Sequence, residues 1–175
     1  LVPAHNESAH VLPTIACLLP QLRAGDRLLV VADNCSDDTA ELARRAGATV
    51  VERHDTTQRG KGHALAFGVN WLRANPPEVL MVVDADCTAS AHAVDVAAAA
   101  VAQHGSPVQL LNLMHAAPGA GRRHRLLEFA MLMKNQIRPQ GAQLLGAGCH
   151  LMGTGMALPR SEERRVGEEC RYRWW

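Results

Sequence analysis

The chain has 175 residues, of which 47% are hydrophobic and 20% are charged, and this is the composition of a single globular domain. Its 18 basic and 17 acidic residues nearly cancel and its aromatic residues are few, so we expect no nucleic-acid partner. No apolar run approaches the ~18 residues that a membrane-spanning helix needs.

Over roughly the first two thirds of the chain, short apolar runs alternate with stretches in which apolar side chains recur at helical spacing. Asn6 or Ser8 is the expected cap of the first helix, whose first turn should be irregular because of Pro13. Strands are predicted at residues 1–4, 27–32, 49–53, 79–83 and 108–114, and helices at 8–22, 37–46, 62–74 and 90–103.

This alternation predicts an α/β fold of right-handed βαβ units, with a mostly parallel, Rossmann-like sheet and helices on both faces. In such sheets, ligands bind outside the carboxyl ends of the strands. Polar and acidic residues gather at three of these ends, at residues 3–7, 32–37 and 84–86. We therefore expect the chemistry of the protein at this edge of the sheet.

Asp84 and Asp86 form a D-x-D motif directly after the most apolar predicted strand. In an extended segment, residues two apart lie on the same side of the chain. Two carboxylates there suit Mg²⁺ or Mn²⁺, which complete their coordination with water and phosphate oxygens. The alternative is a strand-end turn in which an aspartate caps the next helix.

Two further groups near this edge are candidates for ligand contact. Asp33 follows the second predicted strand, where its carboxylate can accept hydrogen bonds from a nucleobase, a ribose hydroxyl or backbone amides. Lys61 lies in the basic glycine turn at 59–62, which suits either phosphate contact or simple helix entry. Asp37 and Asp38 are interpreted as helix caps.

Other reaction classes find little support in the sequence. No G-x-S-x-G or G-x-G-x-x-G follows a strand, which disfavours acyl transfer and dinucleotide redox chemistry. The five cysteines include no C-x-x-C pair, so neither a disulfide framework nor a structural zinc site is expected. Reduced thiols predict a cytoplasmic protein.

The later part of the chain departs from the alternating pattern. Residues 122–137 are amphipathic and are predicted to form a helix that covers the sheet, with a membrane-surface helix as the alternative because of the basic cluster at 122–125. The glycine-rich stretch at 146–158 predicts tight turns or close backbone contacts. Residues 161–175, charged and without periodicity, are predicted to be a non-native or disordered tail.

Four segments resemble family 2 glycosyltransferases of the GT-A fold in their order and spacing. They read PAHNE at 3–7, VADNCSDDT at 31–39, RGKGHAL at 59–65 and VDAD at 83–86. The resemblance covers residues 1–160, which we predict to be a GT-A domain that is incomplete at both ends. It implies an inverting enzyme that moves a sugar from a nucleotide-sugar, commonly a UDP-sugar, to an acceptor hydroxyl.

The resemblance also implies roles for individual residues. Asp33 is similar to the aspartate that binds the base, and Asp84 and Asp86 to the metal-binding pair, with Asp86 as the more direct ligand. Gly153-Thr154-Gly155 resembles the segment that lines the acceptor side. The residues assigned to the donor site in this way are Pro3, Ala4, Glu7, Asp33, Lys61, Asp84, Ala85 and Asp86.

Two features depart from the family pattern. The family's catalytic base lies in an acidic motif some tens of residues beyond the glycine-rich segment, and the glutamates of the tail lie too close to that segment to be assigned to it. The tail's final residues, 170–174, resemble a Q-x-x-R-W motif but lack its glutamine. Ala32 stands where many relatives have a first aspartate, so the base contact rests on Asp33.

We therefore expect a glycosyltransferase fragment that keeps most of the donor and metal site but lacks its catalytic base. The alternatives are a non-catalytic module that binds nucleotide and metal, and a Mg²⁺-dependent phosphotransferase that uses the D-x-D aspartates as nucleophile and acid. The acceptor is left open as a saccharide or a lipid. A membrane is expected as a partner only through flanking segments outside this chain.

Overall fold

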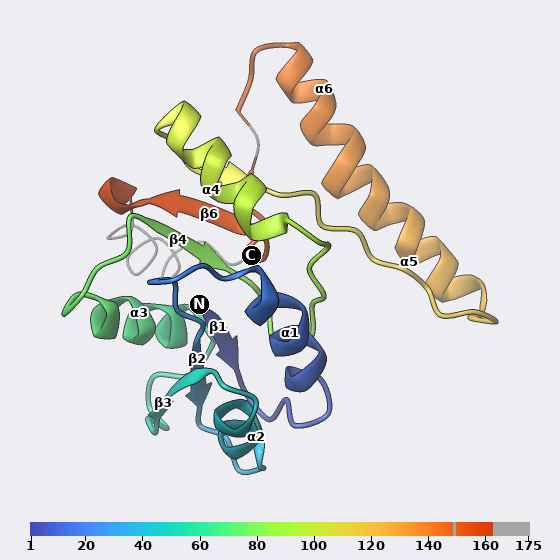
Figure 1. The fold of residues 1–175 in the computed structure, drawn as a ribbon. Coiled ribbons are helices and arrows are strands. Elements are labelled where there is room, and N and C mark those ends of the chain that lie inside the picture. The colour runs from blue at the N-terminus through green and yellow to red at the C-terminus, as the bar shows by residue number, and fades with distance from the viewer. Residues whose placement is uncertain (149, 163–175) are drawn as a thin grey trace.

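The computed structural model describes residues 1–148 and 150–162 and shows the expected α/β fold (Figure 1). Two three-stranded sheets, in the orders β1-β2-β3 and β4-β6-β5, meet at Leu1. The nitrogen of Leu1 donates to the Met81 carbonyl at 2.8 Å, and its carbonyl accepts from the Val83 amide at 3.1 Å. The strands are β1 (Val2–Ala4), β2 (Leu29–Asp33), β3 (Thr49–Arg53), β4 (Val79–Val82), β5 (Val108–Gln109) and β6 (Met156–Pro159).

The predicted α/β fold with parallel strand pairing is confirmed, and the antiparallel part of the sheet is larger than expected. The pairs β1–β2 and β2–β3 are parallel, whereas β6 runs antiparallel to both of its neighbours, β4 and β5. Strand β6 was not expected, because its four residues follow a glycine-rich stretch and are too few to show a strand periodicity. Strand β5 is limited to two residues, although the apolar run at 108–114 predicted a longer strand.

Helices cover both faces of the sheet, as the alternation of apolar side chains along β2 requires. Leu29 and Val31 pack with α3 (Lys61–Leu72), whereas Val30 packs on the opposite face with α1 (Val11–Leu18) and α2 (Thr39–Arg45). The remaining helices are α4 (Ala93–His104), α5 (Arg122–Leu132) and α6 (Arg138–Leu144), with short helical segments at Leu19–Gln21, Met133–Ile137 and Arg160–Glu162.

Helix α1 begins later than the sequence indicated. His10, and not Asn6 or Ser8, occupies the N-cap position, and its side chain makes no capping hydrogen bond. The Glu7 carbonyl accepts the amides of His10 and Val11, both at 2.9 Å, so backbone turns lead the chain into the helix. Residues 5–10 are thereby kept out of the helix and form a loop at the carboxyl end of β1.

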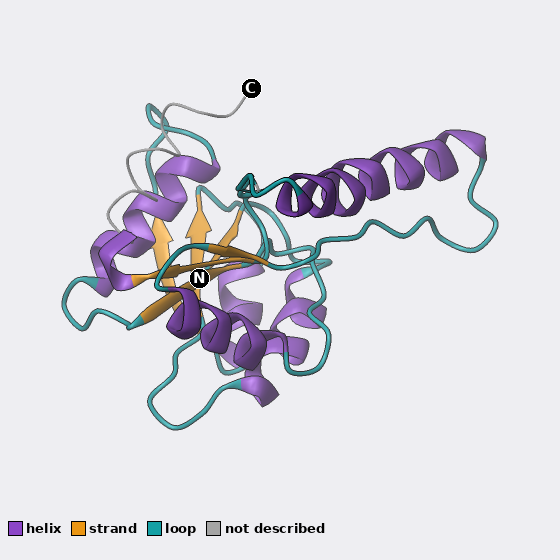
Figure 2. Ribbon diagram, turned by 90° about the horizontal axis from the view of Figure 1, so that it is seen from above, coloured by secondary structure: helices purple, strands orange, loops and turns teal. Residues whose placement is uncertain are grey.

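The expectation that residues 122–137 cover the sheet is wrong. Helix α5, the π-helical segment Met133–Ile137 and α6 form one long rod that extends away from the sheet in both views (Figures 1 and 2). Asn135 is the one buried residue in this described stretch, and its Nδ2 donates to the Asn112 carbonyl at 2.9 Å. None of the helices in the described residues is both long and apolar enough to span a bilayer.

Gly68 allows α3 to approach the sheet closely. A Cβ atom built at this position would lie 2.6 Å from Leu1 Cδ1 and 2.9 Å from Val31 Cγ2. We expect Gly68→Ala to lower the free energy of unfolding by about 1–3 kcal/mol, because overpacking outweighs the better helix propensity of alanine. Urea unfolding measures the change. Gly141→Ala in α6 is the control, since nothing lies within 4 Å of its Cβ, and equal stability of both variants would contradict the argument.

Candidate functional site

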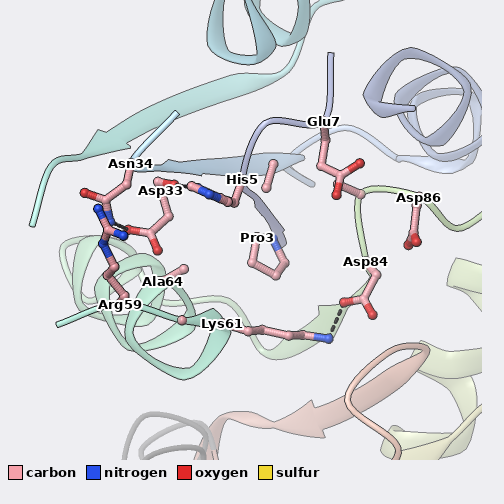
Figure 3. A pocket seen from close by; sticks show the side chains of 13 residues that line it. Pro3, His5, Glu7, Asp33, Asn34, Arg59, Lys61, Ala64, Asp84 and Asp86 are labelled. Atoms are coloured by element: carbon pink, nitrogen blue, oxygen red, sulfur yellow. Dashed lines mark hydrogen bonds and ion pairs between the residues drawn. The ribbon is translucent and has the colours of Figure 1, made fainter. Parts of the chain in front are cut away.

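A pocket of about 440 Å³ opens where the carboxyl ends of β1, β2 and β4 meet the start of α3 (Figure 3). This volume lies in the range of small-molecule sites, about 300–1,000 Å³. Each residue that the sequence assigned to the donor side lines it, although the four segments are far apart in the chain. The lining residues are Pro3, Ala4, His5, Glu7, Asp33, Asn34, Arg59, Gly60, Lys61, Ala64, Asp84, Ala85 and Asp86.

One end of the pocket is built around Asp33, whose carboxylate is held by a buried ion pair. Its Oδ1 accepts hydrogen bonds from Arg53 Nη1 at 2.7 Å and from Asn34 Nδ2 at 3.0 Å. Asp33 and Arg53 are only 5% and 8% exposed. The His5 ring nitrogen Nδ1 lies 2.7 Å from the Asp33 carbonyl oxygen, which fixes the backbone at the same point. Oδ1 is thus engaged by protein groups, and the carboxylate still borders the pocket.

Arg53 also reaches a second carboxylate, because its Nη2 donates to Asp55 Oδ2 at 3.1 Å. Hydrogen bonds from the Thr57 hydroxyl and from the backbone amides of Gln58 and Thr57 lower the pKa of Asp55 to about 2. Asp55 therefore stays ionised at neutral pH, and the Arg53 guanidinium lies between two acidic side chains. The sequence did not indicate the ion pair of Arg53 with Asp33. It arises because these two residues are register partners on the parallel strands β2 and β3.

The other end of the pocket carries the D-x-D carboxylates. Ligand atoms of Asp84, Asp86 and Cys87 lie within 4.8 Å of one another. Burial, together with the negative charges of the two aspartates, raises the pKa of the Cys87 thiol, so at neutral pH it is a protonated, poor ligand. The two carboxylates remain as hard oxygen donors, which fit Mg²⁺ or Mn²⁺ better than a soft metal.

Lys61 connects the two sides of the pocket, because its Nζ forms an ion pair with Asp84 Oδ1 (Figure 3). Gly60, the N-cap of α3, has φ 109° and ψ 161°, a conformation that is open essentially to glycine alone. This turn lets Lys61 stand at the first position of the helix and extend across the pocket floor. Arg59 is also on the lining, at the end of the pocket where Asp33 and Asn34 lie (Figure 3).

Hydrogen bonds between loops hold the β1–α1 segment in place. Asn6 adopts φ 55°, a left-handed conformation that asparagine tolerates, and its Oδ1 accepts from the Ser36 amide at 2.8 Å. The Glu7 amide donates to Thr39 Oγ1 at 2.8 Å. The loop that contributes Glu7 to the pocket is therefore fixed to the start of α2.

Asp37 makes the capping contact that the sequence indicated. Its Oδ1 accepts from the Thr39 amide and its Oδ2 from the Ser8 amide, both at 3.1 Å. Partial desolvation opposes ionisation, but the hydrogen bonds from Thr39 and Ser8 together lower the pKa of Asp37 to about 2. Asp38 occupies the N-cap position of α2 without a side-chain hydrogen bond.

Gly153-Thr154-Gly155 lies behind the D-x-D motif and outside the lining of the main pocket. The buried Thr154 hydroxyl accepts the Asp84 amide at 3.0 Å. Thr154 and Gly155 line a second pocket of about 280 Å³, next to Cys87. The predicted absence of a catalytic base concerns the tail of the chain. Residues 163–175 of this tail lie outside the described residues, and they include Glu163, Glu168 and Glu169.

Known proteins resemble this chain in sequence and in structure. The profile of glycosyl transferase family 2 matches residues 1–162. An uncharacterized glycosyltransferase of Mycobacterium tuberculosis is 41% identical over 86 residues, 49% of this chain and 35% of that protein. The 4,4'-diaponeurosporenoate glycosyltransferase of Staphylococcus aureus is 35% identical over 91 residues, 50% of this chain and 23% of its own length. The matches thus cover about a third or less of these curated relatives.

A solved structure shares the fold over most of the chain. It is glucosyl-3-phosphoglycerate synthase from Mycobacterium tuberculosis in complex with Mn²⁺, uridine diphosphate and phosphoglyceric acid. The TM-score is 0.61 at 25% identity, and the match covers 91% of this chain and 54% of that one.

Proposed function

Because the chain belongs to glycosyl transferase family 2, we propose that it binds a UDP-sugar and transfers the sugar to an acceptor hydroxyl with inversion at the anomeric carbon. The observation that carries this proposal is the meeting of four separate sequence segments in one pocket of about 440 Å³. The structural likeness to a synthase solved with Mn²⁺ and uridine diphosphate supports the same donor class.

The two ends of the pocket differ in a way that would orient a nucleotide. Asp33, Asn34 and Arg59 lie at one end, and Asp84 and Asp86 at the other (Figure 3). A carboxylate accepts the N–H of a base, whereas paired carboxylates require a cation before a diphosphate can approach them. The base therefore belongs beside Asp33 and the diphosphate beside the D-x-D pair, in this proposal.

Asp84 and Asp86 are the residues that would hold Mg²⁺ or Mn²⁺. When bound, such an ion neutralises negative charge that develops on the departing diphosphate. Lys61 adds a second positive charge at the same end, and its ion pair with Asp84 keeps that ammonium beside the pocket. Asp86 lines the same pocket, is exposed and takes no part in the ion pair of Lys61 with Asp84, so we assign it the more direct contact with the ion.

The acceptor is proposed to approach from the side of the second pocket, where Thr154 and Gly155 lie behind the D-x-D motif. The class of acceptor, saccharide or lipid, is not assigned. Assays of sugar release or transfer from UDP-sugars separate a transferase from a module that only binds nucleotide. A phosphoenzyme formed without nucleotide preference would instead indicate the phosphotransferase.

Base selectivity is the direct test of the donor site. We expect uridine diphosphate to bind more tightly than cytidine diphosphate by about 1–3 kcal/mol, because the Asp33 carboxylate accepts the uracil N3–H, whereas cytosine N3 is itself an acceptor. Isothermal titration calorimetry in the presence of Mn²⁺ measures both affinities. In Asp33→Asn the preference should disappear, since an amide can pair with either base.

Asp55→Asn is the matched control for this experiment. Asp55 contacts the same guanidinium as Asp33 but does not line the pocket, so its variant should retain the preference for uridine diphosphate. Equal affinities of the unaltered protein for the two nucleotides, or a preference that survives Asp33→Asn, would remove Asp33 from the base site.

A further inference from the structure

The rod formed by α5 and α6 carries a row of apolar side chains that are exposed among the described residues. Leu126, Phe129, Met133, Ile137 and Leu144 follow one another at intervals of three, four, four and seven residues, which places them along one side of a helix. Their side chains are between 39% and 88% exposed. Asn135, whose contact with Asn112 attaches the rod to the preceding segment, lies on the opposite side.

Basic residues gather on the rod that carries this apolar row. Over residues 122–145 the sequence has five basic side chains and a single acidic one, Glu128. The whole chain has a net charge of only +1, so the positive charge is concentrated on the rod. Glu128 lies near His115, at 3.6 Å. The basic side chains are Arg122, Arg123, Arg125, Lys134 and Arg138.

We propose that the α5–α6 rod binds the surface of a membrane that contains anionic phospholipids, with the apolar row inserted among the acyl chains and the basic side chains at the phosphate groups. A helix with this division of side chains lies in the plane of the interface and does not span it. Each Lys or Arg near an anionic surface adds attraction to the lipid phosphates.

The same charges argue against other occupants of the apolar row. A second copy of the chain would bring a like-charged face against this one, and the repulsion opposes pairing. A nucleic acid would meet the basic side chains, but its phosphates could not bury five apolar side chains. An anionic bilayer satisfies both kinds of group at once.

Vesicle co-sedimentation of the full chain tests the proposal. At about 0.1 M salt we expect at least tenfold stronger partitioning onto vesicles of equal parts phosphatidylglycerol and phosphatidylcholine than onto phosphatidylcholine alone, with a loss at high salt. Leu126→Ser, which alters the apolar row, should weaken partitioning by about tenfold.

Leu127→Ser is the matched control, because Leu127 is the adjacent residue and is also exposed, but it lies about 100° around the helix from the row. It should leave partitioning nearly unchanged, and circular dichroism of both variants checks that the rod still forms. Equal effects of the two substitutions, or binding indifferent to lipid charge, would overturn the proposal. So would concentration-dependent self-association that Leu126→Ser abolishes in the absence of vesicles.

Discussion

Asp86→Ala is expected to reduce Mn²⁺-dependent binding of uridine diphosphate on the order of 100-fold or more, because it removes a proposed direct ligand of the ion. Loss of a residue that only supports a ligand already costs about 10–100-fold in metal affinity. The argument rests on the positions of the two aspartates. Asp84 already forms an ion pair with Lys61, whereas Asp86 is an exposed residue of the pocket lining. Calorimetric titration of nucleotide with and without Mn²⁺ separates the metal-dependent part of the affinity.

The fold should survive this substitution, since an exposed side chain at the edge of the sheet contributes little to the core. Asp95→Ala is the matched control, because Asp95 is an aspartate on α4 with a surface ion pair to Arg23 and no place in the pocket. Equal, metal-dependent binding by the unaltered protein and by Asp86→Ala would remove Asp86 from the metal site.

The sheet and the location of the pocket could be predicted from local sequence patterns. Short apolar runs separated by amphipathic stretches gave four strands close to their observed positions, and β3 matches its predicted bounds. Asp33 and Asp84 follow two of these runs, so the rule for parallel sheets brought them to one edge. Their functional roles remain predictions that the proposed experiments test.

Features that depend on tertiary contacts were not predictable in this way. The ion pair of Arg53 with Asp33 requires the register of β2 against β3, which no local pattern encodes. Helical periodicity correctly indicated a helix at 122–137, but it gives only the side on which apolar residues lie. It does not specify what that side contacts, and none of the residues of α5 is buried.

Removal of Arg53 is expected to cause the largest loss of stability among the substitutions considered. In Arg53→Met the Asp33 carboxylate remains buried with only the Asn34 amide to compensate it, and breaking a buried pair in this way typically costs about 3–5 kcal/mol. Urea unfolding of the nucleotide-free protein measures the effect. Arg44→Met is the matched control, because the ion pair of Arg44 with Glu52 is more than 40% exposed on both sides and should contribute less than about 1 kcal/mol.

Arg53 does not line the pocket, so any effect on nucleotide binding acts through Asp33 and makes Arg53 a positioning residue. Without the guanidinium, Oδ1 of Asp33 loses the hydrogen bond that orients the carboxylate, and the preference for uridine diphosphate over cytidine diphosphate should fall even where the protein remains folded. Combining Arg53→Met with Asp33→Asn removes the unpaired charge, so the double variant should be more stable than Arg53→Met alone. If Arg53→Met lowers the free energy of unfolding by less than about 1 kcal/mol, or if the effects of the two substitutions simply add in the double variant, this buried pair does not organise the base end of the pocket.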